Sequence, residues 1–385
     1  MTINRLLKSQ KPFLQCSHVL KDFQRGRLAA PISVDHLNDK YQYLTKGQIP
    51  MLHFQRSLPR LAIPKLEVTI QRYLAAVEPL YSDKAVFDKM AIEAQQFAST
   101  GNGPTLQKLL IAHDKANRHT SYISEPWFDM YLKDRKPLPI NYNPVLIMKP
   151  DEKNGNEYNN QLTRTANLVV SSLRFMRALN EQLLEPEVYH MNPKKSDTPK
   201  FRKILSRTPG AIATFVAYAF KAFPLDMSQY EGLFGATRIP EVGKDRISRT
   251  TDSTHICVMK NGHIYAVNVL DNSGNIESPS AIVKRLKYVY NSPECQKVAE
   301  HPIGILTTEN RDVWAKARQH LCDTFNKTSL ELIDSALFCV SLDEEAPYGT
   351  NPLEKPEPIV QNFLHGINNS IKNRFEFHRK WQCSL

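Results

Sequence analysis

The sequence predicts a mixed α/β or α+β fold, because segments with helical periodicity are interspersed with strand signals. Helical segments dominate the first half of the chain, a hairpin signal lies near residue 260, and a short apolar run lies near residue 340. The chain has 385 residues, of which 41% are hydrophobic and 23% are charged. That length and composition are ordinary for a globular protein with a sizeable core.

Three segments carry apolar residues three and four positions apart, which is the spacing of one helix face. They span residues 65–80, 105–119 and 160–183. The longest stripe belongs to the third segment and consists of Leu162, Ala166, Val169, Leu173, Met176 and Leu179. Stripes of this kind are usually core packing, so we assign no cofactor site to them.

Two strand signals flank the dipeptide Asn261-Gly262, which tolerates the positive φ angles of a type I′ turn. Residues 255–259 and 264–269 are therefore expected to pair as a β-hairpin. Ser278 precedes Pro279 and is expected to cap a helix that ends near Tyr290. A further helix is expected over 310–324, and the apolar residues 336–342 are consistent with a buried strand.

The six cysteines are scattered, with no CxxC pair and no His/Cys cluster at zinc spacing. The sequence therefore predicts free thiols in a reducing compartment and no metal centre. It contains no stretch of about 20 apolar residues of the kind that a membrane-spanning helix needs.

The net charge of +11 is concentrated in two segments. Residues 1–34 carry +5, residues 184–224 carry +4, and all other residues together carry +2. Since no basic and aromatic face runs through the body of the chain, the sequence argues against nucleic acid as a partner.

Residues 1–34 are rich in Lys and Arg and contain a single acid, Asp22. Interspersed leucine, phenylalanine and valine residues make this composition typical of an amphipathic mitochondrial presequence. A disordered basic tail is the alternative interpretation. The absence of a continuous apolar core argues against a secretory signal.

The second basic segment joins cations to an apolar run over 211–220 that is too short to span a bilayer. One interpretation is an interfacial helix among anionic lipid headgroups. The other is a core helix with a solvated basic approach. The candidate membrane-binding residues are Lys200, Arg202, Lys203, Arg207, Phe215, Tyr218 and Phe220.

Several strings resemble known sequences. Residues 58–70, LPRLAIPKLEVTI, resemble the N-terminal signature of the choline/carnitine acyltransferase family, except that Ala62 stands where the family usually has a proline. Further strings are similar to mitochondrial, inner-membrane members that act on long-chain acyl groups. They are HTSYISEPWFDMYL at 119–132, LLEPEVYH at 183–190, PLDMSQY at 224–230, TENRDVW at 308–314 and DSALFC at 334–339.

The resemblance implies a fold, substrates and a location. The fold would be the N-terminal portion of a CoA-dependent acyltransferase, a chloramphenicol acetyltransferase-like sandwich of two related halves, here over residues 52–385. The substrates would be long-chain acyl-CoA and carnitine, with no metal or prosthetic group. Trp127 and Tyr131 would lie near the substrate tunnel. Residues 184–224 match the place of an insert that attaches such enzymes to anionic lipid on the matrix face of the inner membrane, which favours the interfacial interpretation.

The family's catalytic base is the histidine of an HxxxD motif, since a histidine suits proton transfer near neutral pH. FLHGINN at 363–369 and Asn373-Arg374 resemble the stretch that precedes this motif, but residues 343–385 then diverge. His365 is expected to be structural. The only HxxxD spacing is His18 with Asp22, inside the predicted presequence, where we interpret it as coincidence.

The family's Ser-Thr-Ser stretch, which helps to bind carnitine, and its basic residues for the CoA phosphates are not found either. We therefore expect this chain alone to be an inactive member of an acyltransferase family. Two alternatives remain: a catalytically dead, membrane-associated binding protein, or an incomplete gene model or splice product.

Overall fold

The computed structural model describes residues 44–138, 148 and 156–343, and these form two compact units. The helical unit comprises Leu58–Tyr131, and the sheet unit comprises the described residues up to Ser57 and from Leu132 onward. The predicted presequence and His365 lie outside the described residues. Of the divergent segment 343–385, only residue 343 is described.

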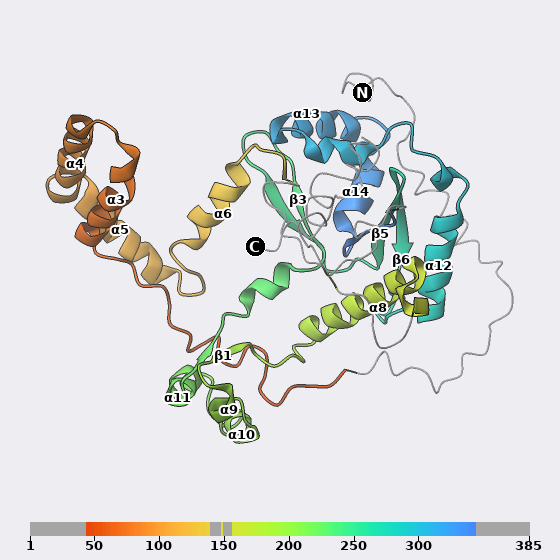
Figure 1. The fold of residues 1–385 in the computed structure, drawn as a ribbon, viewed down its shortest axis with the longest axis horizontal. Helices are drawn as coiled ribbons and strands as arrows, with labels where there is room; N and C mark the ends of the chain where they lie inside the picture. The colour runs from red at the N-terminus through yellow and green to blue at the C-terminus, as the bar shows by residue number, and fades with distance from the viewer. Residues whose placement is uncertain (1–43, 139–147, 149–155, 344–385) are drawn as a thin grey trace. The chain divides into compact units, whose positions relative to one another are not determined.

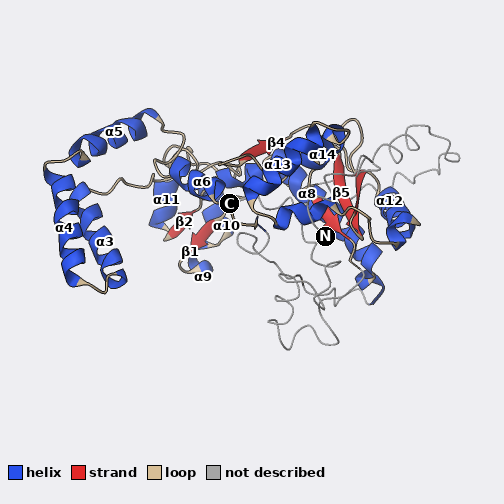
Figure 2. Ribbon diagram, turned by 90° about the horizontal axis from the view of Figure 1, so that it is seen from above, coloured by secondary structure: helices blue, strands red, loops and turns tan. Residues whose placement is uncertain are grey.

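The helical unit consists of α-helices with a short 3₁₀ turn. Its elements are α3 (Leu66–Val77), η2 (Glu78–Leu80), α4 (Lys84–Ser99), α5 (Gly103–Ala116) and most of α6 (Ser124–Lys133). Helices α3, α4 and α5 pack against one another (Figure 2). The stripes at 65–80 and 105–119 correctly predict α3 and α5, whereas α4 was not predicted.

A three-stranded mixed sheet forms the centre of the sheet unit. Strand β5 (His255–Lys260) pairs antiparallel with β6 (His263–Asn268) and parallel with β7 (Cys339–Ser341). Asn261 and Gly262 join β5 to β6 with φ angles of 49° and 81°. Both angles are positive, as a type I′ turn requires, so the predicted hairpin is confirmed.

Helices cover both faces of this sheet, and the alternation of side chains along β5 explains how. Ile256 and Val258 face the core that includes α8 (Gln161–Asn180) and α12 (Pro279–Asn291). Cys257 and Met259 instead face the side of α13 and α14, whose bounds are Arg311–Cys322 and Lys327–Ser335. In Figure 1, α12 and α14 accordingly lie on opposite sides of the hairpin. The prediction of mixed α/β structure is confirmed.

The remaining elements extend the sheet unit. The strand pairs are β1 (Val188–His190) with β2 (Ala222–Pro224), and β3 (Ala236–Ile239) with β4 (Arg246–Arg249). Between β1 and β2 come α9 (Pro193–Ser196), α10 (Pro199–Leu205) and α11 (Ala213–Ala219). Short 3₁₀ turns are η3 (Asn156–Asn159), η4 (Ser228–Gly232), η5 (Glu294–Gln296) and η6 (Ile303–Thr308).

Two predicted helix starts are confirmed by side-chain caps. Ser278 accepts a hydrogen bond from the Ala281 amide at 3.2 Å, and Asn310 accepts one from the Asp312 amide at 2.9 Å. Each cap satisfies one of the amides that a helix start leaves without an intrahelical partner. No disulfide joins the four cysteines that the structure describes, which are Cys257, Cys295, Cys322 and Cys339.

Within the described ranges, no helix is both long enough and apolar enough to cross a bilayer.

Candidate functional site

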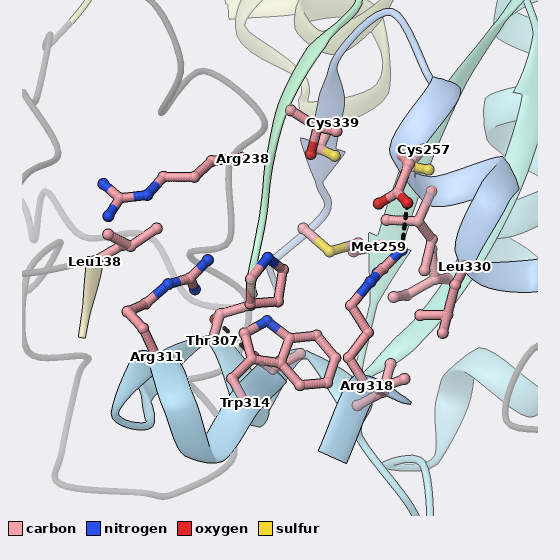
Figure 3. Close-up of a pocket in the computed structure, with 17 residues that line it drawn as sticks. Leu138, Arg238, Cys257, Met259, Thr307, Arg311, Trp314, Arg318, Leu330 and Cys339 are labelled. Atoms are coloured by element: carbon pink, nitrogen blue, oxygen red, sulfur yellow. Dashed lines mark hydrogen bonds and ion pairs between the residues drawn. The ribbon is translucent and has the colours of Figure 1, made fainter. Parts of the chain in front are cut away.

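A cavity of about 120 Å³ lies in the sheet unit, between the sheet and helices α13 and α14 (Figure 3). Met259 of β5, Ile264 of β6 and Leu330 of α14 supply apolar walls. Arg311, Trp314 and Arg318 reach it from α13. These three residues are spaced i, i+3 and i+7, so the helical period places them on one face of α13.

Next to the cavity, one buried carboxylate is shared by three guanidinium groups. Asp245 is fully buried, and its Oδ2 lies 2.6 Å from Arg238 Nε and 2.7 Å from Arg311 Nε. Its Oδ1 lies 3.1 Å from Arg135 Nη2. The Asp245 amide also donates to the Leu132 carbonyl, and the Arg311 amide donates to the Arg135 carbonyl. This arginine–aspartate cluster therefore links the β3–β4 hairpin, the start of α13 and residues 132–135.

Arg311 has donor capacity left over at this cluster. The residue is 1% exposed, and its Nη2 atom is buried with no hydrogen-bond partner among the described residues. Burial lowers the pKa of the guanidinium, while the charge of Asp245 opposes that shift. A buried charged donor without a partner costs about 1–3 kcal/mol or more.

Further polar side chains line the cavity. Cys257 and Cys339 contribute thiols, Arg318 pairs with Asp334, and Thr307 donates its hydroxyl to the Gly304 carbonyl. No histidine is among its described lining residues. Across the described ranges, no group of three or more His, Cys, Asp or Glu side chains could hold a metal ion.

No sequence motif marks this cluster. Arg311 and Trp314 belonged to a recognition string, but Arg135, Arg238 and Asp245 had no motif. The i, i+3, i+7 spacing on α13 was the one available signal, and it cannot show that a buried carboxylate lies opposite.

The two predicted tunnel residues lie on α6, in the helical unit. The rings of Trp127 and Tyr131 are 5.4 Å apart at an interplanar angle of 60°. Trp127 is exposed, and neither residue lines the cavity of the sheet unit. Their spacing of four residues places the rings on the same face of the helix.

The predicted membrane-binding residues lie between β1 and β2. Phe215 projects from α11 and is 65% exposed, whereas Ala213 and Ala217 of the same helix are buried. The Tyr218 ring lies 6.4 Å from Phe215 and 5.2 Å from Phe223. We call Phe215, Tyr218 and Phe223, together with Tyr189, the aromatic row, because Tyr189 is the cross-strand partner of Phe223 and is also exposed.

Phe220 and Arg202 differ from the other predicted membrane-binding residues, because each contacts neighbouring side chains of the protein. The half-buried Phe220 ring lies 5.5 Å from the buried Phe201 ring, so it packs against that residue. Arg202 pairs with Glu185 at 3.0 Å and with Asp197 at 2.6 Å. In contrast, Lys200, Lys203 and Arg207 are exposed. Sequence reasoning missed Tyr189 and Phe223 because each lies in a strand of only three residues.

Comparison with known proteins gives one family. The model of the Choline/Carnitine o-acyltransferase family matches residues 61–380. Mitochondrial carnitine O-palmitoyltransferase 2 of Mus musculus is 44% identical over 90% of this chain and 52% of its own length. The Homo sapiens protein of the same name is 45% identical over 84% of this chain and 48% of its own length.

A more distant relative is the muscle isoform of carnitine O-palmitoyltransferase 1 of Homo sapiens. It is 28% identical over 84% of this chain and 37% of its own length. The chain spans about half the length of the curated relatives that it matches best among these.

Proposed function

Because this chain belongs to the choline/carnitine O-acyltransferase family, we propose that it forms the N-terminal part of a carnitine O-palmitoyltransferase. Such an enzyme would transfer long-chain acyl groups between coenzyme A and carnitine. The observation that carries the proposal is the identity of 45% to the human type 2 protein against 28% to the human muscle type 1 protein, each over 84% of the chain. A sheet covered by helices on both faces is compatible with one half of the two-half acyltransferase sandwich.

The reaction needs a base that takes the proton from the carnitine hydroxyl or the CoA thiol. The histidine in the centre of the sheet unit, His255, does not suit that role, because its Nε2 lies 2.8 Å from the Leu332 carbonyl and its Nδ1 lies 3.3 Å from the Ser253 hydroxyl. With no HxxxD spacing other than that of His18 and Asp22, residues 1–385 alone are expected to be inactive.

The test is an assay of purified residues 1–385 with palmitoyl-CoA and carnitine, beside the mouse type 2 enzyme. No turnover above the rate without protein is expected from this chain. Turnover comparable to that of the mouse enzyme would refute the assignment of the base to the HxxxD histidine.

We further propose that the segment 184–224 binds anionic lipid at the matrix face of the mitochondrial inner membrane. The aromatic row supports this, because Tyr189, Phe215 and Phe223 are exposed and aromatic side chains favour the interface between headgroups and acyl chains. Lys200, Lys203 and Arg207 would add about 1 kcal/mol each near an anionic surface. The hydroxyls of Thr214 on α11 and Ser57 are 2.9 Å apart, at hydrogen-bond distance. This contact would fix the orientation of α11 so that Phe215 faces outward.

Liposome co-sedimentation with cardiolipin-containing vesicles tests this proposal. Wild type should sediment at low salt and bind more weakly at high salt, because salt screens the attraction. Replacing Lys200, Lys203 and Arg207 with serine should reduce the salt-dependent part, and replacing Phe215, Tyr218 and Phe223 should remove the remainder. Phe325→Ser is the matched control, since Phe325 is 76% exposed but lies outside the segment. Wild type that stays in the supernatant at low salt would refute lipid binding.

Residues 1–34 are proposed to direct import into mitochondria. The motivation is their basic, acid-poor composition, which is typical of presequences. A fluorescent fusion carrying these residues should reach mitochondria, and a matched fusion with the Lys and Arg residues replaced by Gln should not. A cytosolic wild-type fusion would contradict the proposal.

A further inference from the structure

Three sulfur-bearing side chains line the cavity between the sheet and helices α13 and α14 (Figure 3). They are Cys257 and Met259 of β5 and Cys339 of β7. Cys257 and Met259 are two residues apart on one strand, so strand alternation places them on the same face of the sheet. Cys339 is the Cα partner of Cys257 in the parallel pair of β5 with β7, so it shares that face. The sheet therefore brings together sulfur atoms from two distant parts of the sequence.

Backbone hydrogen bonds fix the register that aligns the two cysteines. The Cys257 amide donates to the Phe338 carbonyl at 3.0 Å, and the Leu342 amide donates to the Met259 carbonyl at 2.8 Å. Both bonds join β5 to the β7 segment, one at each end of the short parallel pair. The spacing of Cys257 and Cys339 is therefore set by the sheet and not by a loop.

The spacing of neighbouring strands suits a bridging metal ion better than a disulfide. Adjacent strands lie about 4.8 Å apart. A metal–thiolate bond is about 2.3 Å long, so two thiolates on opposite sides of one ion lie about 4.6 Å apart. The Cβ atoms of a disulfide are on average only about 3.8 Å apart, which would draw the two strands together. Cys257 and Cys339 are not joined by a disulfide.

The donor atoms favour a soft, monovalent ion. Thiolate and thioether sulfur suit Cu(I), whereas a structural zinc site takes four ligands from cysteine, histidine and carboxylate side chains. Within the described ranges, no three His, Cys, Asp or Glu side chains are placed to hold a metal ion, so the thioether of Met259 is what completes this site. Cys257 is buried, but Cys339 is only half-buried, so an ion can be taken up at Cys339 and passed inward.

We propose that Cys257, Cys339 and Met259 form a binding site for one Cu(I) ion. The two thiols lose their protons to solvent when they bind the ion, and Met259 supplies its thioether as a neutral third ligand. No electron is transferred in this step, because copper enters as Cu(I) and the sulfur atoms are not oxidised. Ile264 and Leu330 line the cavity beside the ligands and provide apolar walls that keep water from the bound ion.

Competition with a chromophoric Cu(I) chelator tests this proposal. The full chain would carry serine at Cys16, Cys322 and Cys383, which leaves Cys257, Cys295 and Cys339 as its thiols. It would be titrated without oxygen into the Cu(I) complex of bicinchoninate. We expect the chain to withdraw one equivalent of Cu(I), and X-ray absorption at the copper edge to show only sulfur in the first shell.

Variants in this background separate the three ligands from the fold. Cys339→Ser should weaken Cu(I) binding by about 100-fold or more, since losing even a group that only orients a metal ligand costs about 10–100-fold. Met259→Leu keeps the apolar volume and should weaken binding by about tenfold. If Cys339→Ser fails to fold by circular dichroism, Met259→Leu decides. Cys295→Ala is the control: Cys295 is also buried but packs in the core on the other face of the sheet, so Cu(I) binding should not change.

Three results would overturn the proposal. They are a folded chain that withdraws no Cu(I) from the chelator, unchanged Cu(I) binding in a folded Cys339→Ser or Met259→Leu variant, and equal loss of binding in a folded Cys295→Ala variant. A first shell of nitrogen or oxygen in the X-ray absorption spectrum would contradict it as well, because it would place the copper at other side chains.

Discussion

Helices with similar apolar stripes have different surroundings in the two units. In the sheet unit, α8 buries six residues: Ala166, Val169, Leu173, Met176, Ala178 and Leu179. In the helical unit, α3, α4 and α6 have no buried residue, and α5 buries only Gly103. Periodicity therefore reports that a segment is helical, and burial depends on whether a second layer packs on the stripe.

Ion pairs, like apolar side chains, are more deeply buried in the sheet unit than in the helical unit. Asp245 in the sheet unit is fully buried among three guanidinium groups, whereas the Arg60–Asp114 pair of the helical unit is partly exposed. Arg60 also donates to the carbonyls of Asn117 and Thr120, so it fixes local chain direction. The ion pairs of Asp245 are therefore shielded from solvent, whereas the Arg60–Asp114 pair is not.

The largest expected effect comes from removing the shared carboxylate. Asp245→Ala leaves buried guanidinium groups without their counter-charge and should cost about 3–5 kcal/mol, whereas Asp114→Ala should cost about 1 kcal/mol or less. Urea unfolding measures both when each unit has a single reporter: Trp314 in a Trp127→Phe, Trp381→Phe background for the sheet unit, and Trp127 in a Trp314→Phe, Trp381→Phe background for the helical unit. Equal losses in the two units would contradict the contrast.

Next in size is the removal of apolar side chains. Leu173→Ala should destabilise the sheet unit by about 2–5 kcal/mol, because Leu173 is fully buried and the change leaves a cavity. Leu109→Ala in α5 should cost about 0.5 kcal/mol or less, since Leu109 is 61% exposed. The same two tryptophans report the result. A large loss at Leu109 would show that its side chain is covered in solution.

Two glycines test strain within the sheet unit. Gly262 and Gly274 have φ angles of 81° and 80°, but a Cβ at Gly262 would lie 2.9 Å from Pro302 Cβ while one at Gly274 would meet nothing within 4 Å. Gly274→Ala should therefore cost about 1–2 kcal/mol from backbone conformation alone, and Gly262→Ala should cost more. Thermal unfolding of both variants measures the difference, and equal midpoints would contradict the close approach of Pro302.

The smallest effect is a pH dependence. A hydrogen bond to Glu187, with burial as a second cause, raises the pKa of Tyr230 to about 12 from the usual value of about 10. Because the folded pKa is the higher one, this contribution to stability is complete below about pH 10 and is lost as pH rises toward about 12. Between about pH 9 and pH 11.5 the free energy of unfolding should therefore fall more in wild type than in Tyr230→Phe. Equal falls would contradict the hydrogen bond.

Local signals predicted some of the elements of each unit. Helices α3, α5, α8, α12 and α13, and strands β5, β6 and β7, lie where periodicity, the Asn-Gly turn and the cap at Ser278 placed them. Strands β1 and β2 have three residues each and pair across more than thirty residues, so no local pattern marks them. The arginine–aspartate cluster draws on positions 135, 238, 245 and 311, which only the tertiary fold brings together.

The surroundings of the candidate site residues also depend on the tertiary fold. The exposed position of Phe215 agrees with its amphipathic context, while Phe220 turned out to pack on Phe201 because α11 ends at Ala219. Trp127 and Tyr131 were selected through resemblance, and their adjacent rings on α6 neither require nor exclude a substrate tunnel. Periodicity alone does not distinguish Phe215 and Phe220, or Trp127 and Tyr131, from other aromatic residues.

The central proposal, that this chain carries part of an acyltransferase site, is tested most directly by a segment exchange. Residues 52–342 would replace the matching segment of mouse carnitine O-palmitoyltransferase 2, and carnitine-dependent release of CoA from palmitoyl-CoA would be measured. We expect a folded exchange enzyme to retain activity and to lose it for palmitoyl-CoA, more than for acetyl-CoA, on Trp127→Ala. A folded exchange enzyme without transfer activity would contradict the proposal.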